Sequence, residues 1–275
     1  MNQTDLTRLR DWFTPFCAVY SRDADDEARR NYLLKEHHTH RVAEAARTIA
    51  ADQGLTGNDL LLAESIGLLH DVGRFPQYRE FRTFRDSDSV NHAGRSVRVM
   101  VEERLLRHLP REEQRLIIRS VALHNVYRIP AFLDERESLF LRLIRDADKL
   151  DIWRVFLEYY ALPEEERASA VGLGFPDRPG CSPRILDAIT REEMINLAEV
   201  KSLNDFKLLQ LSWIFDLNFG ATRRLFRERG YLERFAAALP PHEEVKLALS
   251  LLASHLERSA ATEATVTSGG AAWIR

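Results

Sequence analysis

Four residues of this chain combine metal-binding side chains with positions that turn inward on predicted helices. They are His40, the adjacent pair His70 and Asp71, and Asp148. Apart from the adjacent pair, each lies on the apolar side or at the end of a different predicted helix. Imidazole nitrogen and carboxylate oxygen suit divalent metals of intermediate hardness. The sequence therefore predicts a buried metal centre formed by several helices.

The adjacent pair His70 and Asp71 ends an apolar run and is the centre of this prediction. Ala63 and Ile66 lie seven and four residues before His70, which places the imidazole on the buried stripe of a helix. Gly73 follows, and we expect it to end that helix with a sharp turn. A buried carboxylate without a partner is very costly, so Asp71 needs a cation or several hydrogen bonds. We therefore assign His70 and Asp71 as catalytic residues and metal ligands.

His40 is placed inward by the pattern of its own helix. Leu33, His37 and Ala43 share its three-and-four spacing, which assigns His40 to the buried stripe. His37 and His38 match no functional pattern and receive no role.

Two further histidines, His92 and His124, lie on the predicted helices between His70 and Asp148. If both face the same cavity, Asp71 would bridge two metal ions. Two ions a few ångströms apart can clamp a phosphate, activate water and stabilise a leaving oxygen. The sequence thus predicts one ion or two.

Each ligand also has a purely structural interpretation when it is taken alone. His124 could be a core histidine and His92 a surface residue. Asp148 could pair with Arg145, and Asp71 could accept hydrogen bonds at a helix end. The combined helix positions favour the metal centre over four separate coincidences.

The segment from Arg74 to Arg98 is expected to bind an anionic substrate. It holds six arginines against three acids, in a chain whose net charge is −3. Arginine binds phosphate through two parallel hydrogen bonds, and aromatic rings can stack on a base. The aromatic candidates are Tyr78, Phe81 and Phe84. The cationic candidates are Arg74, Arg82, Arg85, Arg128 and Lys149. The alternative is a solvated loop whose aromatic rings pack into the core.

The same residues resemble the signature of the HD-domain superfamily of metal-dependent phosphohydrolases. The first motif resembles the residues around His40, and the second resembles Leu69–Arg74. The last resembles Asp146–Asp151, with Asp148 as the matching ligand. The resemblance covers about residues 33–155, roughly half of the chain.

Dinuclear members of that superfamily place additional histidines where this chain has His92 and His124. The resemblance therefore implies an all-α bundle that holds one or two divalent ions, of the type Mn, Fe, Co, Ni, Zn or Mg. The implied ligands are His40, His70, Asp71, Asp148, His92 and His124.

Composition limits the class of protein. The chain has 275 residues, of which 45% are hydrophobic and 29% charged, as is ordinary for a globular protein. A net charge of −3 gives no reason to expect nucleic-acid or membrane binding. Cys17 and Cys181 are too few for a disulfide framework. Without a signal peptide or a long apolar run, the expected location is the cytoplasm.

Helical periodicity dominates the chain, so the predicted fold is all-α. We expect a single HD-type helical domain over residues 1–258, with a core at about 33–155. A C-terminal helical extension at about 186–258 would pack on that core, and residues 259–275 would form a flexible tail. The Gly- and Pro-rich connection at 161–185 could instead mark a subdomain boundary.

The expected function is hydrolysis of a phosphomonoester or phosphodiester by metal-activated water, with a small phosphorylated substrate such as a nucleotide. One alternative is an iron-dependent oxygenase or lyase, which coloured protein and oxygen-dependent turnover would favour. A second is a regulatory module that binds metal and nucleotide without forming product. A third is a structural helical protein with buried polar pairs. The oligomeric state is left open.

Overall fold

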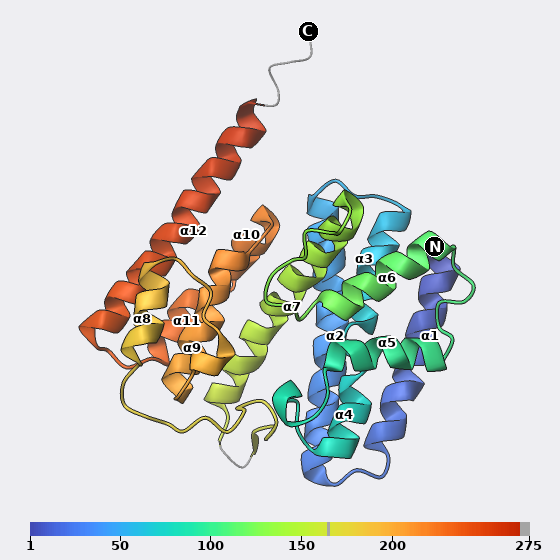
Figure 1. Ribbon diagram of the computed structural model, residues 1–275, viewed down its shortest axis with the longest axis horizontal. Coiled ribbons are helices and arrows are strands. Elements are labelled where there is room, and N and C mark those ends of the chain that lie inside the picture. The colour runs from blue at the N-terminus through green and yellow to red at the C-terminus, as the bar shows by residue number, and fades with distance from the viewer. Residues whose placement is uncertain (164–165, 270–275) are drawn as a thin grey trace. The chain divides into compact units, whose positions relative to one another are not determined.

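The computed structural model describes residues 1–163 and 166–269, with side chains described as far as residue 261. The predicted all-α class is confirmed: the described residues contain α-helices and short 3-10 helices but no strand (Figure 1). The chain divides into two compact units, Met1–Leu173 (unit 1) and Gly174–Arg275 (unit 2). The boundary falls inside the predicted connection at 161–185. That the C-terminal helices and the first bundle form one domain stays a prediction.

Unit 1 is a bundle of seven described α-helices with α2 at its centre. Helix α2 contacts α1, α3, α4 and α7, and α6 packs on α5 and α7 (Figure 1). The helices are α1 (Gln3–Ser21), α2 (Asp26–Asp52), α3 (Asn58–Leu69), α4 (Arg74–Phe81), α5 (His92–Glu102), α6 (Arg111–Leu123) and α7 (Glu135–Ala161), with a 3-10 turn η1 (Asp86–Asp88).

Helices α2 and α3 approach each other closely because Gly67 has no side chain. A Cβ atom at Gly67 would lie 2.6 Å from the Cα atom of Ala43, which no real structure tolerates. Since His70 directly follows α3, this contact sets its imidazole beside α2. A glycine in α3 thus brings two predicted ligand helices together.

Gly73 acts through a second close approach. The expected turn is present at residues 70–73, but α3 already ends at Leu69. The φ of Gly73, −67°, is ordinary for a right-handed helix. A Cβ atom would instead lie 2.6 Å from the carbonyl oxygen of His92. Its N–H donates to Ser96 Oγ at 2.8 Å. Gly73 therefore allows the start of α4 to pack on the first turn of α5.

Helix boundaries follow capping side chains. Asp25 accepts from the Ala28 N–H and begins α2. Asp134 forms a capping box with Glu137 at the start of α7. Within the arginine-rich segment Arg74–Arg98, the first eight residues form α4.

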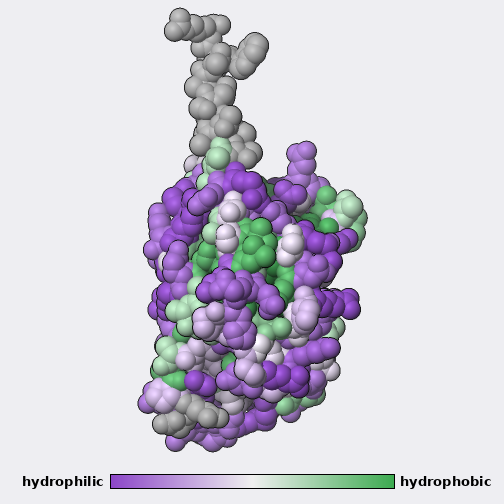
Figure 2. Space-filling view, turned by 90° about the vertical axis from the view of Figure 1, so that its left-hand side faces the viewer, coloured by the Kyte–Doolittle hydropathy of each residue, from purple (hydrophilic) through white to green (hydrophobic). Residues whose placement is uncertain are grey.

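Unit 2 contains α8 (Pro183–Thr190), α9 (Leu203–Ser212), α10 (Gly220–Glu228), α11 (Tyr231–Ala237) and α12 (Glu243–Gly269), with the 3-10 turns η3 (Leu197–Glu199) and η4 (Trp213–Asp216). Figure 2 views the face of this unit that carries α12, where hydrophobic residues gather within hydrophilic surroundings. Leu247 is exposed on that helix. Because α12 continues to Gly269, the tail predicted from residue 259 is wrong as far as 269. The rest of it, 270–275, lies outside the described residues.

Among the described helices, none is both long enough and apolar enough to cross a bilayer.

Candidate metal centre

Four side chains from three regions of unit 1 meet in its interior. Asp148 Oδ1 lies 3.1 Å from His38 Nε2 and 3.6 Å from His70 Nε2. Asp71 Oδ2 lies 3.7 Å from each of the same two nitrogens. His38 lies on α2 and Asp148 on α7, whereas His70 and Asp71 directly follow α3. The donor atoms of His38, His70 and Asp71 are close enough to one another to share one ion, and so are those of His70, His124 and Asp148.

The histidine that α2 contributes is His38, so the assignment of His40 is wrong. Residues two apart on a helix point about 200° apart, which places them on opposite faces. His40 is exposed and packs edge-on against Phe13, on the side of α2 that faces α1. The prediction failed because it counted the helical spacing from Leu33. That residue is 40% exposed, so it does not mark the buried face of α2.

His92 and His124 form a second half of the cluster around the same carboxylate. Their Nε2 atoms lie 3.0 Å apart, and His92 Nε2 lies 3.6 Å from Asp71 Oδ1. Asp71 therefore turns Oδ2 towards His38 and His70 and Oδ1 towards His92. The geometry matches the predicted bridging position of Asp71.

All four histidines use Nδ1 for a hydrogen bond and direct Nε2 into the cluster. His70 Nδ1 lies 2.7 Å from the carbonyl oxygen of Gly67, and His124 Nδ1 lies 2.8 Å from that of Val121. A carbonyl can only accept, so these Nδ1 atoms carry the proton. In neutral imidazole the Nε2 lone pair is then available to a metal.

Two acids that the sequence analysis missed orient the remaining imidazoles. Asp151 Oδ2 lies 2.7 Å from His38 Nδ1, and Asp86 Oδ2 lies 2.7 Å from His92 Nδ1. Carboxylate–histidine pairs of this kind fix the tautomer of metal-binding histidines. Asp151 could have been found one helical turn after Asp148, whereas nothing in the local sequence singles out Asp86.

The donor atoms fit a bound cation. His38 Nε2, His70 Nε2 and Asp148 Oδ1 are buried and have no hydrogen-bond partner among the described residues. Buried polar atoms are rarely left in this state, because each one costs free energy. In the second half, the Nε2 lone pairs of His92 and His124 face each other. Divalent ions would satisfy both halves.

Neighbouring cations and burial keep the cluster ready for a metal. Burial would raise the pKa of Asp71, but Lys35 and the nearby His70 and Arg74 outweigh it and hold that pKa well below the ordinary carboxyl value. Burial, with His92 and His70 close by, lowers the pKa of His124 to about 3. Ionised carboxylates and neutral imidazoles are the forms that bind metals.

Arg74 is an internal residue of the centre and a poor match for its predicted role in substrate binding. Its Nε lies 3.3 Å from Asp71 Oδ1, and its Nη1 lies 3.0 Å from Asp86 Oδ1. The same guanidinium donates to Gln77 Oε1 and to the carbonyl oxygen of Phe84. Arg74 therefore holds the two carboxylates in place.

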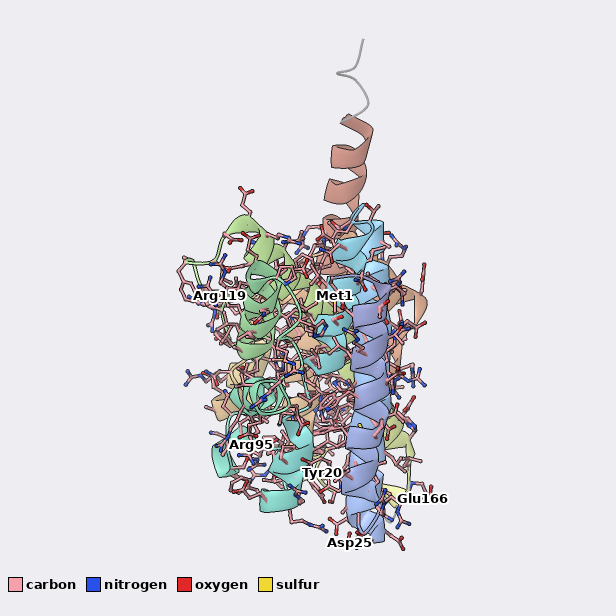
Figure 3. The ribbon with its side chains drawn as sticks, turned by 90° about the vertical axis from the view of Figure 1, so that its right-hand side faces the viewer. Met1, Tyr20, Asp25, Arg95, Arg119 and Glu166 are labelled. Atoms are coloured by element: carbon pink, nitrogen blue, oxygen red, sulfur yellow. The ribbon has the colours of Figure 1, made fainter. Side chains whose placement is uncertain are left out.

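The other predicted cations are spread over the unit. Arg82 donates to both oxygens of Asp25 at 2.9 and 3.1 Å. Asp25, labelled in Figure 3, lies in the connection between α1 and α2. Arg85 lies 3.5 Å from Asp88, and Lys149 is buried. Arg128 is exposed four residues after His124. The chain does not bring these four into one cluster.

The aromatic side chains predicted to stack on a base are mostly core residues. Tyr78 is fully buried and its ring lies 5.1 Å from that of Phe84, which is also buried. Phe81 is half-buried. The stacking interpretation is therefore wrong for Tyr78 and Phe84, because the rings fill the space between α2, α4 and the loop after α4.

Comparison with known families agrees with this geometry. The family model of the HD domain matches residues 36–153, a segment that contains every described ligand of the cluster. Residues 36–153 are an HD domain. HD domains bind divalent metals and belong to a family of metal-dependent hydrolase type. Searches of curated proteins and of solved structures found no match to this chain.

Proposed function

We propose that this HD domain is a metal-dependent phosphohydrolase that cleaves a phosphomonoester or phosphodiester, such as a nucleotide. The observation that carries the proposal is the position of Asp71 between two sets of histidines, with one carboxylate oxygen directed to each set. A shared carboxylate is the arrangement by which two ions can be held close enough to act on one phosphate.

The residues that would hold the first ion are His38, His70, Asp71 and Asp148. When bound, divalent ions at this centre would supply Lewis acidity and lower the pKa of water. His92 and His124 would hold the second ion together with Asp71.

The protein's own contribution is to fix these groups before substrate arrives. Asp151 and Asp86 orient two of the imidazoles. Arg74, held by further acceptors, places a fixed positive charge beside Asp71. Preorganised charge of this kind costs no rearrangement when negative charge develops on the phosphoryl oxygens.

The test is phosphate release from a panel of nucleotides and simple phosphoesters. Protein stripped with a chelator should be inactive and should regain activity with Mn, Ni, Co or Mg. Asp71→Asn is the variant that tests the centre, because it keeps the shape of the side chain and removes the charge that both sets of histidines share. Phosphate release that is equal in Asp71→Asn and wild type would overturn the proposal. The proposal would also be overturned if the purified protein were coloured by iron and turned over only with oxygen. Nucleotide binding without any product would overturn it as well.

A further inference from the structure

Lys35 is a cation inside the centre that the sequence motifs do not include. It lies on α2, three residues before His38, so both side chains leave the same face of the helix. Its Nζ is 2.7 Å from Asp71 Oδ2, and its side chain is 13% exposed. Its only other described partner is the ring of Phe84, 5.3 Å away.

The contact between Lys35 and Asp71 uses an oxygen that a metal ion would need. Asp71 Oδ2 is the carboxylate oxygen that faces His38 and His70, each at 3.7 Å. An ammonium and a divalent ion cannot share this oxygen cheaply, because like charges a few ångströms apart repel strongly in a protein interior. Metal binding must therefore release Lys35 from Asp71.

Arg74, the other cation on Asp71, is held in place by further acceptors. Its guanidinium also donates to Asp86, Gln77 and the carbonyl oxygen of Phe84. Lys35 has no such second acceptor. Its four-carbon stem is flexible and its ammonium is a compact charge with three donors. Of the two cations, Lys35 is the one that can move.

We propose that Lys35 exchanges partners: it neutralises Asp71 while the first metal position is empty, and it binds a phosphate oxygen of the substrate once that position is filled. The Phe84 ring keeps the stem beside the centre in both states. The second half of this proposal rests on the phosphohydrolase function proposed above, whereas the first half concerns metal binding alone.

The exchange predicts two effects of opposite sign for Lys35→Met. Metal-free Lys35→Met should bind Mn²⁺ roughly tenfold more tightly than wild type, the factor that corresponds to a charge-assisted hydrogen bond. The Mn-loaded variant should bind inorganic phosphate roughly tenfold more weakly, for the same physical reason. Titration calorimetry with Mn²⁺ alone, and then with inorganic phosphate, measures both. A structural role for Lys35 would weaken both affinities together.

Two controls accompany this titration. Lys35→Arg keeps the charge and should bind phosphate within a few fold of wild type. Lys246→Met removes an exposed lysine on α12 and should change neither affinity. Thermal unfolding covers the risk that Lys35→Met is unstable. The exchange predicts a lower melting temperature for the metal-free variant and recovery with Mn²⁺, whereas an equal loss in both states would overturn it.

The outcomes separate the two proposals. Unchanged or weaker Mn²⁺ binding by Lys35→Met would overturn the exchange at Asp71. Tighter Mn²⁺ binding with unchanged phosphate affinity would overturn the transfer to phosphate. If Lys35→Met shows both shifts but wild type hydrolyses no phosphoester, the hydrolase function fails and the exchange of Lys35 stands.

Discussion

The two halves of the metal centre are built from different parts of the helices. In the first half, His38 and Asp148 project from the interiors of the long helices α2 and α7, and of the histidines and Asp148 there only His70 directly follows a helix end. In the second half, His92 is the first residue of α5 and His124 directly follows α6. Helix interiors are held by hydrogen bonds on both sides, whereas helix ends are the first to open.

The acids that orient the imidazoles differ in the same sense. The side chain of Asp151, which holds His38, is 4% exposed, whereas that of Asp86, which holds His92, is 30% exposed. Asp86 comes from the loop between α4 and α5, and it depends on donors such as Arg74 and Gln77. We infer that the first half is rigid and binds its ion tightly, and that the second half is adaptable.

The largest expected effect is at the first half. Asp148→Asn removes the charged ligand that His38 and His70 both face. Metal content should fall by at least one ion per chain and phosphate release by more than about 100-fold, the upper range for outer partners of metal ligands. Elemental analysis and an activity assay measure this loss. If Asp148→Asn kept the wild-type metal content, the first half would not be the tighter metal site.

At the second half, the loss should be smaller. His124→Ala should remove one of two ions and leave the first half loaded, because His38, His70 and Asp71 form a group that is close enough to hold an ion without His124. Metal titration should therefore show the tighter site retained and the weaker one lost. Loss of both ions would mean that the halves bind metal as one unit.

Removing the orienting acids should give intermediate changes. Asp151→Asn should weaken the tighter site, and Asp86→Asn the weaker site, each by roughly 10- to 100-fold. Because Asp86 is more exposed, we expect its effect to lie at the lower end of that range. The comparison is made by Mn²⁺ titration of both variants. Equal weakening of both sites by either variant would contradict independent halves.

The smallest expected effect is on the stability of metal-free protein in acid. Burial, with His92 and His70 nearby, lowers the pKa of His124 from 6.5 to about 3. Between pH 6.5 and about pH 3, the unfolded chain binds a proton at His124 that the folded chain does not bind. The stability that is present above pH 6.5 is therefore lost as the pH falls. One such group contributes at most about 1.4 kcal/mol per pH unit. His38, whose pKa is raised chiefly by Asp148 and Asp151 against the effect of burial, acts in the opposite sense.

Urea denaturation at several pH values between 7 and 4 checks this effect. The free energy of unfolding of metal-free wild type should fall more steeply than that of His124→Gln. Equal slopes would show that His124 is not held neutral in the folded state.

The sequence predicted the all-α fold and most of the ligand set, because an apolar stripe and a neighbouring motif mark a ligand helix. It failed at His38 for a local reason. Counting forward from His38, the buried residues Val42, Ala46 and Ile49 define the inward face of α2. The prediction instead took the exposed Leu33 as a buried position, and the spacing from Leu33 leads to His40.

The cations were harder to predict, since their partners are distant in the chain. Arg82 is paired with Asp25, and Arg74 with Asp86. No spacing rule relates residues that meet only after α1, α2 and α4 pack. Lys35 is close to His38 in sequence, but only the packing of α3 on α2 brings it to Asp71.

The most direct test of the centre is the metal content of His38→Ala and His40→Ala, prepared side by side. These histidines are two residues apart on α2 and differ only in the face of the helix that carries them. We expect His38→Ala to lose the tightly bound ion and the phosphatase activity, while His40→Ala keeps the wild-type metal content. Loss of metal in His40→Ala, with retention in His38→Ala, would contradict the account.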